Sequence, residues 1–186
     1  GWQTIDGLLY YFDASGAMAA GWTKLDGYWY YFNNEGKLMT GWMQLDGKFY
    51  YLHTDGRMVI GWQSDGTNKY YMDTVSGVMA VGWKQIDKSW YYFNQAGHMI
   101  TGWLNDGGRY YYLNPADGKM VTGWQKIDGN WYYFKNMSLV KNAFVKKGKK
   151  YGYVDATGKF TTGWVVVDNS QNLVRYINPD KKGFVQ

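Results

Sequence analysis

The pair Gly-Trp recurs along the sequence at an almost constant interval. It begins at Gly1, Gly21, Gly41, Gly61, Gly82, Gly102, Gly123 and Gly163. The first seven copies are 20 or 21 residues apart, and the gap of 40 before the last contains a diverged copy, Ala143-Phe144. A fixed period of this length indicates a stack of small structural repeats. We therefore divide the chain into nine repeats, of which the last is irregular.

Repeat 2, residues 21–40, illustrates the structure expected of one unit. Asp26-Gly27 is a two-residue turn signal between alternating side chains, and it predicts a β-hairpin. The same dipeptide stands at residues 6–7, 46–47 and 128–129. With this turn, Trp22 pairs with Tyr31. Because side chains alternate along a strand, Trp22, Trp29 and Tyr31 share one face. The other face carries Leu25, Tyr28, Tyr30 and Phe32.

The hairpins must stack on one another, because an isolated two-stranded hairpin is marginally stable in water. The expected fold class is all-β: a β-solenoid of stacked β-hairpins built from about nine repeats of ~20 residues. We expect a single module over residues 1–186. It would comprise regular repeats over 1–142, a degenerate repeat over 143–162 and an irregular C-terminal cap over 163–186.

Composition narrows the possible functions. Aromatic residues make up 20% of the chain, with Trp 11 and Tyr 19, which favours rings that are exposed for stacking or cation binding. Cysteine is absent, so disulfides and thiolate metal sites are not expected. No apolar run reaches the ~18 residues of a membrane span, and no leader opens the chain, so we expect a mature piece of something larger. The net charge is +5, and its densest run, residues 146–150, is expected to be a solvated turn; the alternative is a patch that attracts polyanions such as phosphate-bearing wall polymers. No nucleic-acid motif is visible.

Aromatic residues also recur seven places after each Gly-Trp tryptophan, a position called here the seventh place. Its occupants are Leu9, Trp29, Phe49, Lys69, Trp90, Tyr110, Trp131 and Tyr151. A tyrosine follows two places later in each of these repeats, and a methionine stands about seven places further on in five of them. Three rings around a small void suit a quaternary ammonium, with each ring contributing about 0.5–2 kcal/mol. A single aromatic cage would bind at roughly millimolar strength, and several cages on one polymer would attach firmly.

The pattern of Gly-Trp, seventh-place aromatic, Tyr-Tyr-Phe and Met resembles the choline-binding repeats of Gram-positive surface proteins, autolysins and phage lysins. The resemblance implies a left-handed β-solenoid in which choline of teichoic acids sits between consecutive hairpins. It also implies a cage of the Gly-Trp tryptophan, the seventh-place aromatic and the second tyrosine of the following repeat, closed by the methionine. The implied role is a non-catalytic wall-attachment module that binds choline or phosphocholine outside the cell.

Carried onto this sequence, the resemblance implies five choline cages. They are Trp22, Trp29 and Tyr51 with Leu38; Trp42, Phe49 and Tyr71 with Met58; Trp83, Trp90 and Tyr112 with Met99; Trp103, Tyr110 and Tyr133 with Met120; and Trp124, Trp131 and Tyr153 with Val140. Of these, the cages at Trp29, Trp90 and Trp131 are expected to fill first.

Two junctions depart from the pattern. Leu9 interrupts the cage beside Trp2 and Tyr31, and Lys69 brings a like charge to the cage of Trp62 and Tyr92, so neither is expected to bind well. A further, noncanonical site is expected from Phe144, Tyr151, Phe160 and Tyr176.

Three alternatives to a choline-binding module stay open. The main one is a glycan-binding module of the glucan-binding or clostridial-toxin type, whose repeats are similar but carry Lys or Thr at the seventh place; the aromatic majority favours choline. An enzyme is disfavoured, because most Asp residues are used in turns, while His53 and His98 lie in separate connectors without partners at metal spacing. No cofactor or metal is expected. A purely structural or partner-binding solenoid also remains, and the resemblance allows a homodimer through the end repeats.

Overall fold

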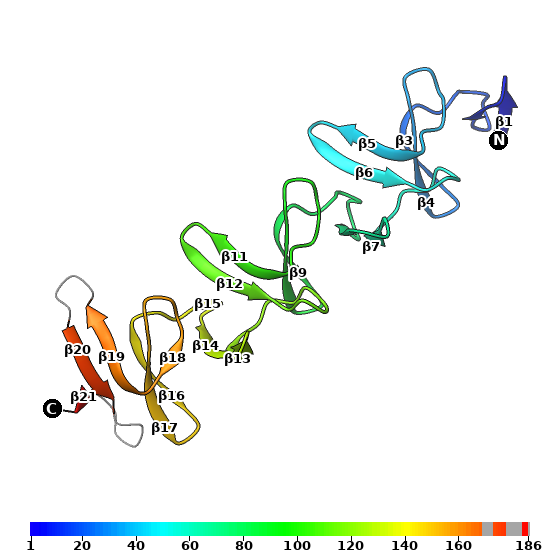
Figure 1. Ribbon diagram of the computed structural model, residues 1–186. Helices are drawn as coiled ribbons and strands as arrows, with labels where there is room; N and C mark the ends of the chain where they lie inside the picture. Colours follow the sequence, from blue (N-terminus) through cyan, green and yellow to red (C-terminus); the bar gives the residue numbers. More distant parts are fainter. Residues whose placement is uncertain (169–172, 178–183, 186) are drawn as a thin grey trace. The chain divides into compact units, whose positions relative to one another are not determined.

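The computed structural model describes residues 1–168, 173–177 and 184–185, and all their regular structure is β-strand (Figure 1). The first five hairpins pair β1 (Trp2–Ile5) with β2 (Leu8–Tyr11), β3 (Gly21–Leu25) with β4 (Tyr28–Phe32), β5 (Gly41–Leu45) with β6 (Lys48–Leu52), β7 (Gly61–Ser64) with β8 (Lys69–Met72) and β9 (Gly82–Ile86) with β10 (Ser89–Phe93). The next four pair β11 (Gly102–Asp106) with β12 (Arg109–Leu113), β13 (Gly123–Ile127) with β14 (Asn130–Lys135), β16 (Ala143–Lys147) with β17 (Lys150–Val154) and β19 (Gly163–Asp168) with β20 (Leu173–Ile177). Short third strands, β15 (Ser138–Leu139), β18 (Phe160–Thr161) and β21 (Phe184–Val185), follow the last three hairpins. The expected fold class, a β-solenoid of stacked hairpins, is confirmed.

The hairpin of repeat 2 has the predicted register. Trp22 pairs with Tyr31 and Lys24 with Trp29. At its turn, Asp26 has φ 48° and Gly27 has φ 87°. Positive φ at both central residues is the signature of a type I′ turn, whose twist matches that of the flanking strands. The Asp-Gly dipeptides therefore form the predicted hairpin turns.

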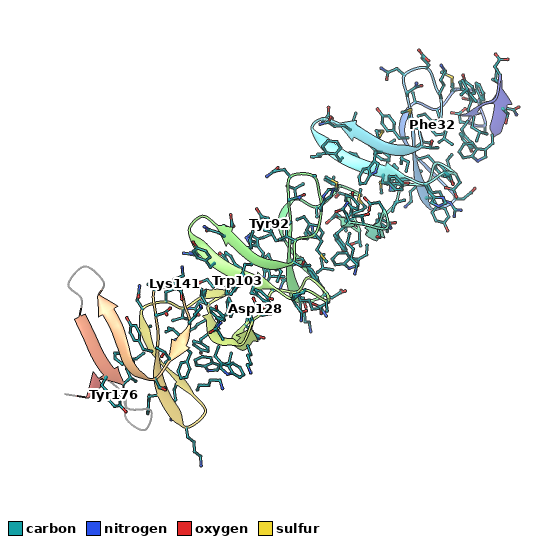
Figure 2. The ribbon with its side chains drawn as sticks, in the orientation of Figure 1. Phe32, Tyr92, Trp103, Asp128, Lys141 and Tyr176 are labelled. Carbon is teal, nitrogen blue, oxygen red and sulfur yellow. The ribbon has the colours of Figure 1, made fainter. Side chains whose placement is uncertain are left out.

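The core of repeats 2 to 9 is centred on one residue at or next to the end of the second strand. The fully or almost fully buried side chains at this place are Phe32, Leu52, Met72, Phe93, Leu113, Phe134, Val154 and Ile177 (Phe32 is labelled in Figure 2). Each of the first seven forms an antiparallel bridge with the residue in the methionine place of its own connector, as Leu52 does with Met58. The connector thereby acts as a third edge of each hairpin and covers this core residue.

Backbone hydrogen bonds join the connectors of repeats 2 to 6 to the preceding hairpin. The N–H of Met58 donates to the carbonyl of Trp29 at 2.7 Å, and the N–H of Met79 donates to that of Phe49 at 2.8 Å. Within its own repeat, the next residue, Val59, donates to the carbonyl of Tyr51 at 2.9 Å. The stacking register of successive repeats is therefore set by backbone groups as well as by packing of the rings.

The chain divides into two compact units, which are described separately. The N-terminal unit comprises Gly1–Lys84 with Tyr92–Met99, and the C-terminal unit comprises Gln85–Tyr91 with Ile100–Gln186. The boundary falls inside the β9–β10 hairpin, and the expectation of a single module remains a proposal. In the predicted cap, β19 and β20 pair with a register shift between Val166 and Asp168, and residues 169–172, 178–183 and 186 lie outside the described residues. The described part of the chain contains no apolar helix of membrane-spanning length.

Candidate aromatic binding pockets

The N-terminal unit contains two equivalent pockets, one repeat apart. The first, called the Trp29 pocket, measures about 270 Å³ and is lined by Trp22, Trp29, Tyr50, Met58, Val75 and Ser76. The second, called the Phe49 pocket, measures about 320 Å³ and is lined by Trp42, Phe49, Tyr70, Met79, Gln95 and Ala96. The larger volume lies at the lower end of the roughly 300–1,000 Å³ typical of small-molecule sites, and the smaller one lies just below it. Each lining residue of one pocket has its counterpart in the other, so the repeat generates the site.

Three consecutive repeats build each pocket. In the Trp29 pocket, repeat 2 supplies Trp22 and Trp29, and repeat 3 supplies Tyr50 and Met58. The connector turn of repeat 4 supplies the remaining wall. The rings of Trp22 and Tyr50 lie 5.0 Å apart at 60°, and those of Trp42 and Tyr70 lie 5.2 Å apart at 58°. These tilted contacts fix the angle between two walls of each pocket.

The methionine of the Trp29 pocket is held from two sides. Its backbone is bonded to the Trp29 carbonyl, and its side chain packs on Gly77 in the next connector. A Cβ atom added to Gly77 would lie only 2.3 Å from the Met58 Sδ atom. Gly77 also has φ +71°, a conformation that other residues rarely adopt. Glycine is therefore required here by both the backbone and the close approach of the methionine.

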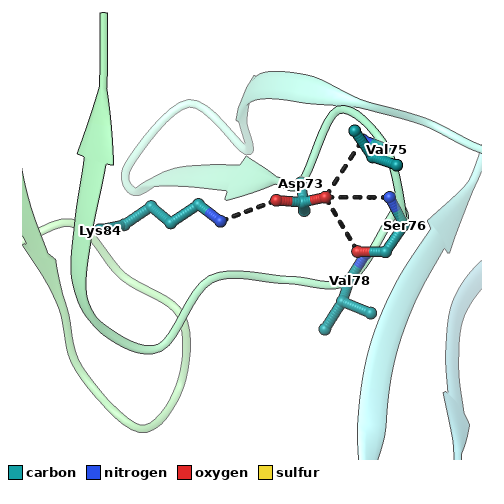
Figure 3. Close-up of polar contacts among 5 residues, drawn as sticks. All are labelled: Asp73, Val75, Ser76, Val78 and Lys84. Atoms are coloured by element: carbon teal, nitrogen blue, oxygen red, sulfur yellow. Dashed lines mark hydrogen bonds and ion pairs between the residues drawn. The ribbon is translucent and has the colours of Figure 1, made fainter. Parts of the chain in front are cut away.

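The connector turn beside Met58 is organised by Asp73 (Figure 3). Its Oδ1 atom accepts hydrogen bonds from the N–H groups of Val75 and Ser76, at 3.1 and 2.9 Å, and from the Ser76 hydroxyl at 3.0 Å. Its Oδ2 atom pairs with Lys84 Nζ at 2.7 Å. The Lys84 hydrogen bond, followed by the backbone donors, lowers the pKa of Asp73. Asp73 thus remains ionised and shapes the turn that lines the Trp29 pocket.

The pockets combine partly exposed rings with uncharged walls. Trp29 is 40% exposed, Phe49 39% and Trp42 48%, so their faces are accessible to a ligand. None of the lining residues carries a formal charge at neutral pH. Behind the Phe49 pocket, the Tyr70 hydroxyl donates to Asp65 Oδ2 at 2.7 Å. Backbone N–H and Tyr70 hydrogen bonds lower the pKa of Asp65, so a negative charge lies behind this ring. The arrangement suits a cation with an apolar surface.

The structure places a different tyrosine in these pockets than the one expected from the resemblance. The Trp29 pocket contains Tyr50, whereas Tyr51 packs on Trp42 of its own hairpin at 5.0 Å. The reason is strand alternation, because Tyr51 shares a face with Trp42 and only Tyr50 faces the preceding repeat. The same shift of one residue recurs in four pairs that lie within one unit: Trp2 with Tyr30, Trp22 with Tyr50, Trp42 with Tyr70, and Trp103 with Tyr132. The expected partners Tyr71 and Tyr133 instead pack on their own Trp62 and Trp124.

The closing side chain also comes from one repeat later than expected. Met58 closes the Trp29 pocket and Met79 closes the Phe49 pocket, in place of the predicted Leu38 and Met58. The backbone register explains this, since Leu38 donates its N–H to Leu9 and so belongs to the preceding junction. By the same hydrogen bonds, Met99 is joined to Lys69 and Met120 to Trp90. The sequence analysis did not predict that the turn residues Val75, Ser76, Gln95 and Ala96 line the pockets. The glycine that follows each of these turns is the feature of the sequence that marks them.

In the C-terminal unit, Trp103 packs on Tyr112 at 5.1 Å and on Tyr132 at 5.0 Å. Tyr110, the seventh-place residue of that repeat, is 36% exposed. The expected cage of Trp83, Trp90, Tyr112 and Met99 has members in both units, and its assembly remains a prediction. Within the N-terminal unit, Trp83 packs on Tyr92 at 5.2 Å.

Trp124 packs on a different residue of the following repeat than the other tryptophans do. Elsewhere the contact is made by the first tyrosine of that repeat, and here it is made by a phenylalanine of its connector. The first tyrosine of repeat 8 is replaced by Gly152, and Phe160 in the methionine place lies against Trp124 at 5.1 Å. A Cβ on Gly152 would approach the Phe160 ring to 2.1 Å, so this phenylalanine fills the vacated space. The predicted partner Tyr153 packs on Phe144 at 5.3 Å.

The neighbouring connector also differs from the prediction. Leu139, and not Val140, occupies the methionine place of repeat 7, because it pairs with Phe134 and packs on Gly158. Of the further site suggested at Phe144, Tyr151, Phe160 and Tyr176, Phe160 instead packs against Trp124. Ile177 and Tyr153 instead form a small core with Phe144.

The two histidines take part in local contacts. His98 packs edge-on against Tyr70 at 5.3 Å, and His53 Nδ1 lies 3.4 Å from Asp55 Oδ1. Among the residues that the structure describes, no three His, Cys, Asp or Glu side chains gather as metal ligands.

Comparison with known proteins identifies the repeat. The family model described as a choline-binding repeat matches residues 1–40, 39–81 and 80–122, and one described as a putative cell wall binding repeat matches residues 122–136. Among solved structures, CbpJ from Streptococcus pneumoniae TIGR4 is 37% identical with a TM-score of 0.79, over 87% of this chain and 57% of that one. Choline binding protein F from Streptococcus pneumoniae is 35% identical with a TM-score of 0.78, over the same shares of 87% and 57%.

The chain thus spans a little more than half the length of these solved structures. Among curated protein sequences, none matches the chain. The matched family model covers well over half of the 186 residues, and its repeats correspond to the hairpin units described above. The chain belongs to the family of choline-binding repeat proteins associated with the bacterial cell wall.

Proposed function

We propose that this chain is a non-catalytic attachment module that binds choline or phosphocholine groups of wall polymers outside the cell, in the Trp29 and Phe49 pockets. The observation that carries the proposal is the repetition of one pocket at an interval of one repeat. Each copy presents two aromatic residues of one hairpin, a tyrosine of the next and a methionine, with no charged lining residue.

A trimethylammonium group matches these walls. It carries a positive charge, has an apolar surface of methyl groups and donates no N–H hydrogen bond, so it requires no acceptor from the pocket. The ring faces attract it through their quadrupoles, with about 0.5–2 kcal/mol from each ring. The net affinity of one pocket is roughly millimolar, near 4 kcal/mol, after the entropy of binding is subtracted.

Repetition converts this weak binding into attachment. When one pocket holds a choline on a polymer, the next choline on the same polymer binds at a high effective concentration. Two pockets in one unit, related by one repeat, therefore hold a decorated polymer more firmly than either holds free choline. A related structure of choline binding protein F was determined in the presence of a peptidoglycan analogue, and another in complex with ipratropium. The first of these supports a role for this family at the cell wall.

A glycan-binding module is the alternative, favoured only by Lys69 at the seventh place of repeat 4. The two are separated by titrating tryptophan fluorescence with choline, with its uncharged analogue 3,3-dimethylbutan-1-ol and with a soluble glucan. The analogue has the same shape as choline but a carbon atom in place of the charged nitrogen. We expect saturation by choline in the millimolar range and at least tenfold weaker binding of the analogue. A response to the glucan without a response to choline would refute the proposal.

A further inference from the structure

Two lysines of the C-terminal unit lie directly over aromatic rings. Lys141 Nζ is 3.6 Å from the centroid of the Tyr110 ring, and Lys147 Nζ is 3.6 Å from that of the Trp131 ring. A cation–π contact is effective within about 6 Å of the centroid, so both ammonium groups occupy the ring faces at close range. Figure 2 labels Lys141 and Trp103, the tryptophan of the repeat that contains Tyr110.

These rings hold the same position in their repeats as the rings of the N-terminal pockets. Tyr110 and Trp131 stand at the seventh place, as Trp29 and Phe49 do. Trp29 also has a lysine nearby, but Lys24 Nζ is 6.0 Å from its centroid and the Lys24 side chain is exposed. The Trp29 face therefore has an ammonium only at the outer limit of this range, whereas the faces of Tyr110 and Trp131 each hold one at 3.6 Å.

The backbone directs Lys147 toward Trp131. Lys147 ends β16 and pairs with Lys150, at the place that Leu25, Leu45 and Ile127 hold in regular repeats. This place lies on the hairpin face that is turned toward the preceding repeat. The adjacent carbonyl, that of Lys146, accepts a hydrogen bond from Trp124 Nε1 at 3.2 Å, which anchors the end of the hairpin beside the same site.

The surroundings of the two lysines differ from those of their neighbours. Lys141 and Lys147 are half-buried, whereas Lys146 and Lys149 are exposed. Over the described residues, no carboxylate forms an ion pair with Lys141 or Lys147. Trp131 is half-buried, compared with 40% exposure for Trp29. The positive charges of Lys141 and Lys147 therefore lie against ring faces and not against acidic side chains.

We infer that Lys141 and Lys147 act as internal cations that occupy the ring faces of the Tyr110 and Trp131 sites and compete there with an external quaternary ammonium. This inference rests on the proposed function and limits it, because it makes the N-terminal pockets the stronger sites. Choline must displace an ammonium that is tethered to the protein, so its affinity at Trp131 is lowered by about 2- to 30-fold, the worth of one cation–π contact.

The test follows single indole N–H signals of the ¹⁵N-labelled chain during a choline titration, assigned with Trp29→Phe and Trp131→Phe variants. In the unsubstituted protein, the Trp29 signal shifts with a millimolar midpoint, and the Trp131 signal requires at least twofold more choline. Lys147→Gln removes the charge and lowers the midpoint of Trp131 by about 2- to 30-fold. Lys149→Gln, an exposed lysine of the same turn, is the matched control and leaves both midpoints unchanged.

The possible outcomes separate the two proposals. Equal midpoints for Trp29 and Trp131 in the unsubstituted protein would overturn the inference and leave the proposed function intact. So would a Trp131 midpoint that Lys147→Gln does not change. If Trp29 itself does not respond to choline, the proposed function fails. Lys147→Met provides a second uncharged variant in case the glutamine perturbs the hairpin, and Lys141→Gln should lower the midpoint of the Trp103 signal in the same way.

Discussion

Replacing Gly77 by alanine tests how the methionine of the Trp29 pocket is held. Gly77 has φ +71°, and an added Cβ would lie 2.3 Å from the Met58 Sδ atom and 3.0 Å from its Cγ. A non-glycine residue in the left-handed region costs about 1–2 kcal/mol, and overpacking a fitted contact costs about 1–3 kcal/mol. Gly77→Ala should therefore lower the free energy of unfolding of the N-terminal unit by about 2–5 kcal/mol, measured by urea titration.

Gly47→Ala is the matched control for this substitution. Gly47 has φ +72°, but nothing lies within 4 Å of an added Cβ, so only the backbone cost of about 1–2 kcal/mol applies. The hydrogen bond from the Met58 N–H to Trp29 should also exchange its proton faster in Gly77→Ala and not in Gly47→Ala. Equal losses of stability in the two variants would refute the packing of Met58 against Gly77. In a Met58→Ala background, which lacks the clashing side chain, Gly77→Ala should cost only the backbone term of about 1–2 kcal/mol.

Three further outcomes are expected. Tyr50→Leu keeps apolar bulk but removes one ring, so calorimetry should show choline binding weakened by about 2- to 30-fold at the Trp29 pocket and binding of 3,3-dimethylbutan-1-ol little changed. Asp73→Asn should cost about 1–2 kcal/mol in urea titrations at pH 6. Because the folded pKa of Asp73 lies below the ordinary 3.8, this stabilisation is complete above that value and should fade as the pH falls below it. Phe160→Met should destabilise the C-terminal unit in thermal melts, and Gly152→Tyr in the same chain should restore stability by refilling the space with a regular ring.

The fold could be predicted from the sequence because its signals are local. The Asp-Gly dipeptide at Asp26 requires positive φ at two consecutive residues, and this turn alone sets the pairing of Trp22 with Tyr31. Repetition then implies stacking, because a single hairpin cannot bury its rings. The face of every ring follows from strand alternation, and this too could be derived from the sequence alone.

The composition of each pocket was harder to predict, because it depends on how neighbouring repeats dock. The resemblance suggested Tyr51 for the Trp29 pocket, although alternation places Tyr51 on the face of its own Trp42; the structure places Tyr50 there. Met58, and not Leu38, lines the Trp29 pocket because of a backbone hydrogen bond between repeats. The spacing of the repeats in the sequence does not reveal this bond. The exchange of Gly152 and Phe160 could have been noticed, since both depart from the pattern in one repeat, but their contact required the fold.

The central claim is that a methylated cation binds between the rings of successive repeats. A crystal of this chain soaked in choline tests it most directly. We predict density for the trimethylammonium group inside the Trp29 pocket, against Trp22, Trp29 and Tyr50, and an equivalent group in the Phe49 pocket. Empty pockets at a choline concentration well above the millimolar range, or choline bound only at other surfaces, would contradict the account.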